Sequence, residues 1–222
     1  MRSQRIAKDY SRQTDIFNPR ASQPAIKIIG AGSVGSFITL ALAKMGLEDI
    51  EIWDGDRVET HNLPNQFYRL QDLGEAKVKA LLKIIKMYEG IDIKAHPVPF
   101  NGQDLKGIVI SAVDSMDARR FVWGQIKGQR KISNYIDTRM GGNLMRIYSV
   151  QPRGECKFYE STLSKKNKLE ELPCTGRTIL YNVLAISGLV GNLVKKMIKK
   201  ESGIPREIIF DLKLLELYKE GR

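Results

Sequence analysis

The segment Gly30 to Gly35 reads GAGSVG and constrains the fold more than any other part of the sequence. It joins an apolar run of strand length, Ala25 to Ile29, to a run with helical apolar spacing, Ser36 to Met45. Glycine permits a tight turn and lets the backbone approach a phosphate, and a following helix presents free N–H groups to the anion. Gly30, Gly32 and Gly35 therefore predict a nucleotide-binding turn.

An acidic residue stands at the place where such a unit binds ribose. A second strand is predicted over Ile50 to Trp53 and ends at Asp54, 19 residues beyond Gly35. An acid there can accept hydrogen bonds from ribose hydroxyls. The alternative is a tight strand–helix turn that binds nothing. The turn does not identify the nucleotide, because dehydrogenases that use a dinucleotide share it.

Strand and helix patterns alternate along the first two thirds of the chain. The predicted strands after Asp54 are 91–98, 107–113 and 131–136, and the predicted helices are 75–88 and 117–127. This alternation predicts an α/β fold with a Rossmann-like, doubly wound and mostly parallel sheet.

The pattern changes after residue 142. Strands at 143–150 and 207–218 and a long helix at 179–200 predict a C-terminal antiparallel extension. The polar stretch 151–177 is predicted to be a long, irregular crossover loop, of the length typical of lids and binding loops. Residues 1–24 form a polar leader, which we expect to contribute to a dimer or to a nucleotide site.

Composition restricts the class of protein and its compartment. No apolar run reaches the ~18–20 residues that a membrane-spanning helix needs, and Met1 to Tyr10 lacks the apolar segment of a secretory signal. We therefore expect a cytoplasmic protein without a membrane partner.

Lysine and arginine outnumber aspartate and glutamate by 36 to 25, a net charge of +11. That excess is either a solvated surface or a patch for an acidic partner such as RNA.

Five ordered motifs, the glycine turn among them, resemble the ThiF/MoeB family of ubiquitin-activating-like adenylyltransferases. Asp54 to Gln66 (DGDRVETHNLPNQ) resembles the family's D-x-D-x-V-x-x-x-N-L-x-R-Q, and Gly74 to Lys77 resembles its G-x-x-K. Ala112 to Ser115 with Arg119 resembles T-D-N-x-x-x-R, and Tyr10 to Gln13 resembles the leader R-Y-x-R-Q. The resemblance covers nearly the whole chain.

This resemblance implies ATP-dependent adenylation of the C-terminal carboxylate of a small ubiquitin-like or sulfur-carrier protein. It implies a single adenylation domain over residues 25–222, with a nucleotide-binding part at 25–140 and a substrate-binding part at 141–222. Lys77 and Arg12 would contact phosphates, Arg12 by reaching across a homodimer, and Asp114 would lie beside Mg²⁺. Asp54 would hold the ribose, and the other matching nucleotide-site positions are Asp56, Asn62, Asn65, Gln66 and Ser115.

Each of these residues also has an ordinary structural interpretation. Lys77 could be a solvated helix lysine, Arg12 a surface charge, Asp114 a helix N-cap and Asn62 a turn residue. One position departs from the family, which usually has arginine where this chain has Asn65. Asparagine cannot replace that charge. We expect Arg69 or Arg57 to compensate for the missing arginine.

The cysteines carry two further expectations. Cys156 falls near the first of the two C-x-x-C pairs that bind zinc in many relatives, but Tyr159 replaces its partner, so we expect no structural zinc. Cys174 precedes the long helix, where relatives that form thioester or persulfide intermediates place their nucleophile. A nearby helix N-terminus and Arg177 would lower its pKa, whereas an inert loop thiol is the alternative.

Other functions stay open at this stage. A relative of this fold, a tRNA threonylcarbamoyladenosine dehydratase, activates a modified tRNA base, and the basic surface suits RNA. The replacement at Asn65 suits a non-catalytic, nucleotide-binding partner subunit. A dehydrogenase is the least favoured, because no acid–base pair for hydride transfer is evident.

Overall fold

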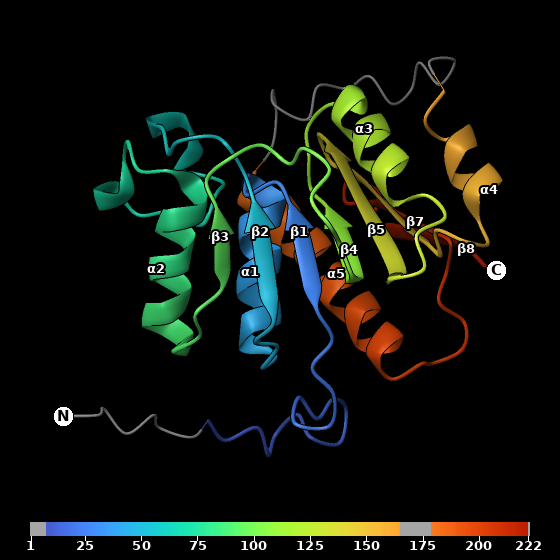
Figure 1. Ribbon diagram of the computed structural model, residues 1–222, viewed down its shortest axis with the longest axis horizontal. Coiled ribbons are helices and arrows are strands. Elements are labelled where there is room, and N and C mark those ends of the chain that lie inside the picture. The colour runs from blue at the N-terminus through green and yellow to red at the C-terminus, as the bar shows by residue number, and fades with distance from the viewer. Residues whose placement is uncertain (1–7, 165–178, 222) are drawn as a thin grey trace.

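The computed structural model describes residues 8–164 and 179–221. Within them, one eight-stranded sheet has the order β3-β2-β1-β4-β5-β6-β7-β8 (Figure 1). The parallel strands are β1 (Ile26–Ile29), β2 (Ile50–Trp53), β3 (Lys94–His96), β4 (Gly107–Ser111) and β5 (Ile132–Gly141). The antiparallel strands are β6 (Leu144–Val150), β7 (Glu207–Asp211) and β8 (Glu216–Glu220). The predicted parallel sheet with an antiparallel extension is confirmed.

The helices of the described residues cover both faces of this sheet. They are α1 (Ser33–Lys44), α2 (Lys77–Glu89), α3 (Met116–Ile126), α4 (Cys156–Ser161) and α5 (Leu180–Ile198), with short 3₁₀ helices η1 (Thr60–Asn62) and η2 (Leu70–Asp72). Successive strand residues point to opposite faces. Ile28 packs with α1, α2 and α5, and its neighbour Ile29 packs with α3 and α4. Burial on both faces explains why β1 and β4 are mostly apolar, with Lys27 of β1 buried in an ion pair with Glu51.

The leader lies at the edge of the sheet where the strands begin, in the lower part of Figure 1. The Gln13 side-chain amide donates a 3.0 Å hydrogen bond to the carbonyl of Met45, at the end of α1. Phe17 is buried, and Gly46 lies so close to Pro19 that a Cβ at Gly46 would be 2.7 Å from it. The described part of the leader is therefore attached to the C-terminal end of α1.

The crossover segment differs from the irregular loop that the sequence predicts. Its first part contains α4, because Tyr159 is fully buried against Trp123 and Tyr135. Residues 165–178 lie outside the described part of the chain. Among the described helices, none is long and apolar enough to span a bilayer.

Candidate functional site

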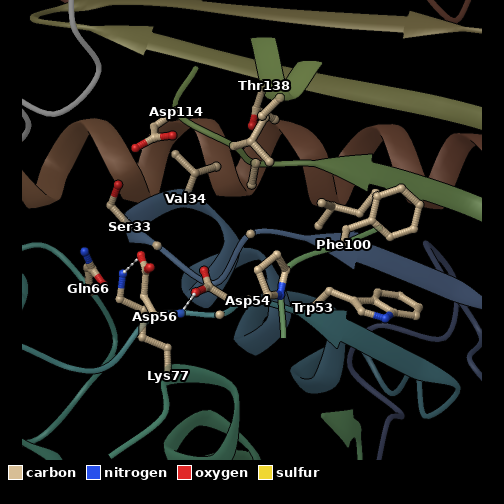
Figure 2. Close-up of a pocket in the computed structure, with 18 of the residues that line it drawn as sticks. Ser33, Val34, Trp53, Asp54, Asp56, Gln66, Lys77, Phe100, Asp114 and Thr138 are labelled. Atoms are coloured by element: carbon tan, nitrogen blue, oxygen red, sulfur yellow. Dashed lines mark hydrogen bonds and ion pairs between the residues drawn. The ribbon is translucent and has the colours of Figure 1, made fainter. Parts of the chain in front are cut away.

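A pocket of about 860 Å³ opens at the carboxyl ends of β1, β2 and β4 (Figure 2). The chain winds from β1 through β2 to β3 on one side and continues through β4 and β5 on the other side. In open α/β sheets, ligands bind in the crevice at such a reversal. The residues that follow these strands, Gly30, Asp54 and Ala112, all line the pocket.

The three glycines of the turn have two different functions. Gly30 has a φ of +98°, and a Cβ there would be 2.5 Å from the carbonyl oxygen of Ala112. A Cβ at Gly35 would be 1.9 Å from the carbonyl oxygen of Gly30. Gly32 lines the pocket, and a Cβ added at Gly32 would have no atom within 4 Å. Gly30 and Gly35 therefore permit close packing, whereas Gly32 leaves space for a ligand beside the backbone.

The N-terminus of α1 lies at this empty space. Ser33 and Val34 line the pocket, and in the described structure no side chain caps the helix at Gly32. The first turn also contains no acidic residue. The N–H groups of a helix's first turn have no partner within the helix and carry a partial positive charge. The turn and the helix together form a site for an anion such as a phosphate.

Asp54 lies centrally in the pocket and supports the turn as well. Its Oδ2 accepts a 2.7 Å hydrogen bond from the amide of Ala31, and its Oδ1 accepts one of 2.7 Å from the amide of Asp56. The carboxylate is partly exposed, so it retains surface for a ribose hydroxyl. The sequence predicts only the ribose role, and the contact with Ala31 adds a structural one.

Lys77 and Asp114 line the same pocket from separate elements, as the sequence predicts (Figure 2). Lys77 begins α2, its side chain is 8% exposed, and its Nζ lies 2.9 Å from Oδ2 of Asp56. Asp114 follows β4 and is exposed.

The N-cap of α3 is Ser115, whose hydroxyl accepts a 3.2 Å hydrogen bond from the amide of Ala118. Asp114 is therefore not the cap, and Ser115, placed in the nucleotide site by the resemblance, caps a helix and does not line the pocket.

The segment after η1 supplies another wall. Asn62, Asn65 and Gln66 all line the pocket. Asn62 is buried, and its Oδ1 accepts a 2.9 Å hydrogen bond from the amide of Glu59, which closes the turn around η1. Asn62 thus has the turn role that was the alternative to ligand binding, and it also faces the pocket.

The two arginines expected to compensate for Asn65 do not line the pocket. The guanidinium of Arg69 binds Asp72, with Nη2 2.7 Å from Oδ1 and Nε 3.0 Å from Oδ2. Burial alone would raise the pKa of Asp72, but these hydrogen bonds bring that pKa below its ordinary value. Arg57 donates a 2.7 Å hydrogen bond to the carbonyl of Gly74. The described structure gives the compensation hypothesis no support at either residue, because both guanidinium groups bind local partners outside the pocket lining.

Two other predicted residues are not brought to this pocket by the described structure. Arg12 is exposed and does not line the pocket, and it belongs to the leader, which lies where the strands begin (Figure 1). Cys174 lies outside the described residues.

Cys156 is half-buried in α4, with its thiol 2.9 Å from the carbonyl of Pro152. Among the described residues, no group of three or more His, Cys, Asp or Glu side chains is arranged to hold a metal.

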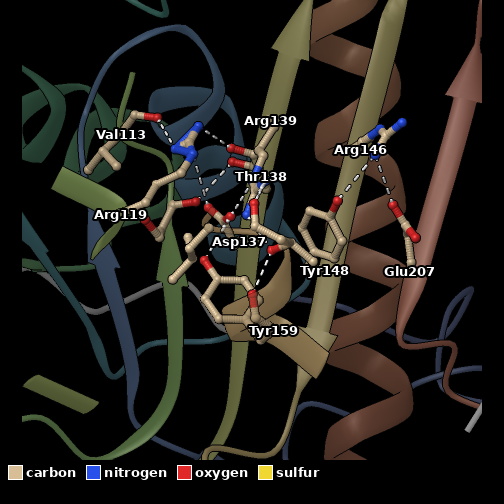
Figure 3. Close-up of polar contacts among 12 residues, drawn as sticks. Val113, Arg119, Asp137, Thr138, Arg139, Arg146, Tyr148, Tyr159 and Glu207 are labelled. Atoms are coloured by element: carbon tan, nitrogen blue, oxygen red, sulfur yellow. Dashed lines mark hydrogen bonds and ion pairs between the residues drawn. The ribbon is translucent and has the colours of Figure 1, made fainter. Parts of the chain in front are cut away.

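A buried ionic network adjoins the pocket, and two of its members, Arg119 and Thr138, line the pocket; the sequence did not indicate the network (Figure 3). Arg119 donates hydrogen bonds of 2.6 Å to the carbonyl of Val113 and 2.8 Å to that of Thr138, so it joins the ends of β4 and β5. Asp137 is fully buried, and its Oδ2 accepts from Arg139 at 2.8 Å and from Tyr159 at 2.9 Å. Strand alternation places positions 137 and 139 on one face, which is the signal that could have indicated this pair.

The other end of the pocket is apolar. Pro99, Phe100, Phe121 and Val122 line it together with Trp53. Trp53 stacks on His96, with ring centroids 4.7 Å apart, and contacts Phe100 edge-on. The pocket therefore has an apolar end suited to a flat ring and a polar end at the glycine turn. Sequence patterns did not indicate the apolar end, because its residues come from separate elements.

Comparison with known proteins gives one family and one fold. The model of the ThiF family matches residues 10–217. The NEDD8-activating enzyme E1 catalytic subunit of Arabidopsis thaliana is 30% identical over 106 residues, 45% of this chain and 23% of that protein. The adenylyltransferase and sulfurtransferase MOCS3 of Oryza sativa subsp. japonica is 37% identical over 71 residues, 32% of this chain and 16% of that protein. These matches span about a quarter or less of those relatives.

Solved structures show the same fold. The structure of E. coli MccB with ATP has a TM-score of 0.72 and 18% identity, and the match covers 89% of this chain and 63% of MccB. The structure of PaaA has a TM-score of 0.71 and 19% identity over 90% of this chain and 64% of that one.

Proposed function

The chain belongs to the ThiF family, and on that premise we propose that it binds ATP in this pocket and adenylates a carboxylate. An oxygen of the carboxylate attacks the α-phosphorus, an acyl-adenylate forms, and pyrophosphate leaves with the electron pair of the broken P–O bond. The carboxylate is that of the C-terminus of a small ubiquitin-like or sulfur-carrier protein.

The single observation that carries this proposal is the convergence of Lys77 and Asp114 on the pocket of the glycine turn. Adenylation brings an anion to a triphosphate, so it depends on cations and N–H donors held in place. The turn and the N-terminus of α1 would hold a phosphate, and Lys77 would exchange Asp56 for a phosphate oxygen.

The two ends of the pocket fit the two ends of ATP. Trp53, Phe100 and Phe121 offer apolar surface to the adenine, and Asp54 offers a carboxylate to the ribose. The MccB structure similar to this chain was solved with ATP, which supports this choice of nucleotide.

A divalent cation also fits the polar end. Asp114 is an exposed carboxylate in the pocket, and Mg²⁺ is usually held by one or two carboxylates together with phosphate oxygens. Asp114 would hold the ion, which would supply positive charge to the triphosphate.

The class of substrate is proposed from the relatives. Their names describe enzymes that activate NEDD8 or SUMO, and adenylyltransferases that also transfer sulfur. Thr138 and Met140, at the end of β5, form a further wall of the pocket. The attacking carboxylate would enter beside this wall.

ATP–pyrophosphate exchange tests the proposal. Labelled pyrophosphate should enter ATP only when a protein with a Gly-Gly tail is present, and Asp114→Asn should abolish the exchange. The same partner without its last glycine is the control. ATP binding without exchange, across a panel of such partners, would reject adenylation.

Capture of the adenylate on Cys174 is a separate step of the proposal. The Cys174 thiolate would attack the acyl carbon, and AMP would leave. Cys174→Ser should leave pyrophosphate exchange unchanged and remove the thiol-sensitive conjugate seen on a non-reducing gel, with Cys156→Ser as the matched control. Equal conjugate in wild type and Cys174→Ser would show that Cys174 is not the nucleophile.

We also propose a homodimer in which Arg12 serves the partner's pocket. Arg12 is exposed and does not line the pocket of its own chain, which supports a role at the triphosphate of another chain. Mixing Arg12→Ala with Lys77→Ala should restore exchange, because one site of the mixed dimer has both cations. No recovery in a mixture that forms dimers by light scattering would reject this role.

A second candidate function is a non-catalytic, nucleotide-binding partner subunit. Asn65 favours it, because neither Arg57 nor Arg69 supplies the missing charge to the pocket. Tight ATP binding with no exchange, and exchange restored by a second ThiF-family subunit, would support this function. Salt-sensitive binding of tRNA would instead favour activation of a tRNA base.

A further inference from the structure

The described structure contains a buried tyrosine whose hydroxyl contacts the glycine turn. The Oη of Tyr68 donates a 2.5 Å hydrogen bond to the carbonyl of Ala31, between Gly30 and Gly32. Tyr68 is 8% exposed, Ala31 is fully buried, and Tyr68 does not line the pocket. The tyrosine thus reaches the turn from a buried position outside the pocket lining.

Both polar groups of Ala31 are therefore engaged. Its N–H donates to Oδ2 of Asp54 at 2.7 Å, and its carbonyl accepts from Tyr68. The peptide unit is planar and trans, so the carbonyl of Ala31 and the N–H of Gly32 point in opposite directions. A hydrogen bond that holds the carbonyl toward Tyr68 fixes the direction of the Gly32 N–H. Gly32 is the turn residue with open space beside it.

The same tyrosine joins two walls of the pocket. It follows the segment that carries Asn65 and Gln66, and the amide of its neighbour Phe67 donates a 3.1 Å hydrogen bond to the hydroxyl of Ser36 in α1. The loop is thus attached to the helix at Phe67 and to the glycine turn at Tyr68.

The hydroxyl of Tyr68 also keeps its proton at neutral pH. Burial raises the pKa of Tyr68 well above its ordinary value, and the nearby carboxylates of Asp54, Asp72 and Asp56 raise it further. The phenol is therefore a permanent donor, and the carbonyl of Ala31 always has its partner.

We propose that Tyr68 is a positioning residue that orients the Ala31–Gly32 peptide so that the Gly32 N–H can bind a phosphate of the nucleotide. This inference rests on the proposed nucleotide binding and names the group that aligns the phosphate donors. Tyr68 itself contacts neither nucleotide nor substrate.

Tyr68→Phe tests the role, because it removes the hydroxyl and retains the ring. Calorimetry should show about a tenfold weaker Kd for ATP and for AMP, the loss expected for one hydrogen bond in the site, and an unchanged Kd for adenosine. A merely structural defect would weaken adenosine as well. Tyr135→Phe is the matched control, since Tyr135 is also buried, does not line the pocket, and has its hydroxyl 3.3 Å from the Tyr159 hydroxyl, away from the glycine turn.

The outcomes separate this inference from the proposed function. If the wild-type chain binds ATP and Tyr68→Phe binds it equally, the inference is overturned and nucleotide binding stands. If the wild-type chain binds neither ATP nor AMP, both are overturned.

A measurement on the wild-type chain covers the case in which Tyr68→Phe does not fold. In NMR spectra, AMP should shift the amide resonance of Gly32, and adenosine should leave it in place. A Gly32 resonance that AMP does not move would overturn the inference.

Discussion

Lys77 and Arg139 are equally buried cations near the pocket, and their surroundings differ. Each side chain is 8% exposed. Arg139 binds the fully buried Asp137, donates to Thr162, and lies 4.4 Å from the centre of the Tyr148 ring (Figure 3). Lys77 faces the pocket, and its ion-pair partner, Asp56, is 72% exposed (Figure 2).

The difference distinguishes a charge that stabilises the fold from one that is available to a ligand. A buried cation surrounded by buried partners would lose them only at a large cost in free energy. A cation whose counterion is solvated can exchange it for a phosphate at little cost, because water stabilises the released carboxylate. The exposed fractions of the two side chains are equal, so they do not distinguish these two roles.

The largest effect is expected from Asp137→Ala. Removing the carboxylate leaves Arg119 and Arg139 as buried charges without their counterion, which should lower the free energy of unfolding by about 3–5 kcal/mol. Urea unfolding followed by circular dichroism measures this loss. A decrease below about 1 kcal/mol, the range of exposed ion pairs, would show that the network is not a structural element.

Lys77→Met should have the next largest effect, and on function instead of stability. Pyrophosphate exchange should fall about 100-fold, the scale of one lost electrostatic contact in a transition state, while the melting temperature changes little. Lys79→Met is the matched control, because Lys79 is exposed on the same helix and does not line the pocket. Equal exchange in the two variants would mean that Lys77 does not serve the nucleotide.

Asn65→Arg should sharpen the contrast by adding a further cation to the pocket wall, beside Asn62 and Gln66. ATP should bind about tenfold more tightly, since arginine can form paired hydrogen bonds with a phosphate. Asn65→Gln, which adds length without charge, is the control. Tighter binding with increased exchange would support catalysis, whereas tighter binding without exchange would support the partner-subunit function.

Arg69→Ala should have the smallest effect on the pocket. ATP binding should not change, and stability at neutral pH should fall by about 1–3 kcal/mol, because the buried Asp72 keeps the backbone amide of residue 69 but loses its charged partner. Impaired ATP binding would contradict the position of Arg69 outside the pocket.

The same variant has an expected dependence on pH. The pKa of Asp72 is lower in the folded chain than in the unfolded one. The contribution of the pair is therefore complete above the unfolded pKa of about 3.9, and it is lost as the pH falls through the folded value. The stability difference between wild type and Arg69→Ala should shrink below about pH 4, and a constant difference would contradict this assignment.

Local patterns predicted the parts of the molecule that local physics controls. Buried strands, the glycine turn and the helix after it follow from apolar spacing and from the conformations that glycine allows. Lys77 and Asp114 line one pocket, because each follows a turn or a strand end at the same edge of the sheet, and their roles toward a nucleotide stay a prediction. Helix α4 was missed because its stability depends on Tyr159, which packs against residues distant in the sequence.

The expectations about Arg57 and Arg69 lack support in the structure for the same reason. The sequence shows that Arg57, Arg69 and Lys77 are cations in the motifs that follow the glycine turn, but it does not show which group each side chain binds. Arg69 binds Asp72 and Arg57 donates a hydrogen bond to a carbonyl, whereas Lys77 lines the pocket. Side-chain partners depend on distances of a few ångströms between separate elements, and spacing along the chain does not specify them.

The sequence by itself determined the sheet with its antiparallel extension, the glycine turn and the family. These follow from short-range spacing and from ordered motifs that each occupy a few adjacent residues. Only the tertiary structure decided which charges face the pocket and which hold the fold together. It also placed Tyr68 behind the turn and the aromatic rings at the far end of the pocket. Those assignments depend on burial and on the orientation of side chains, which arise only when distant segments pack together.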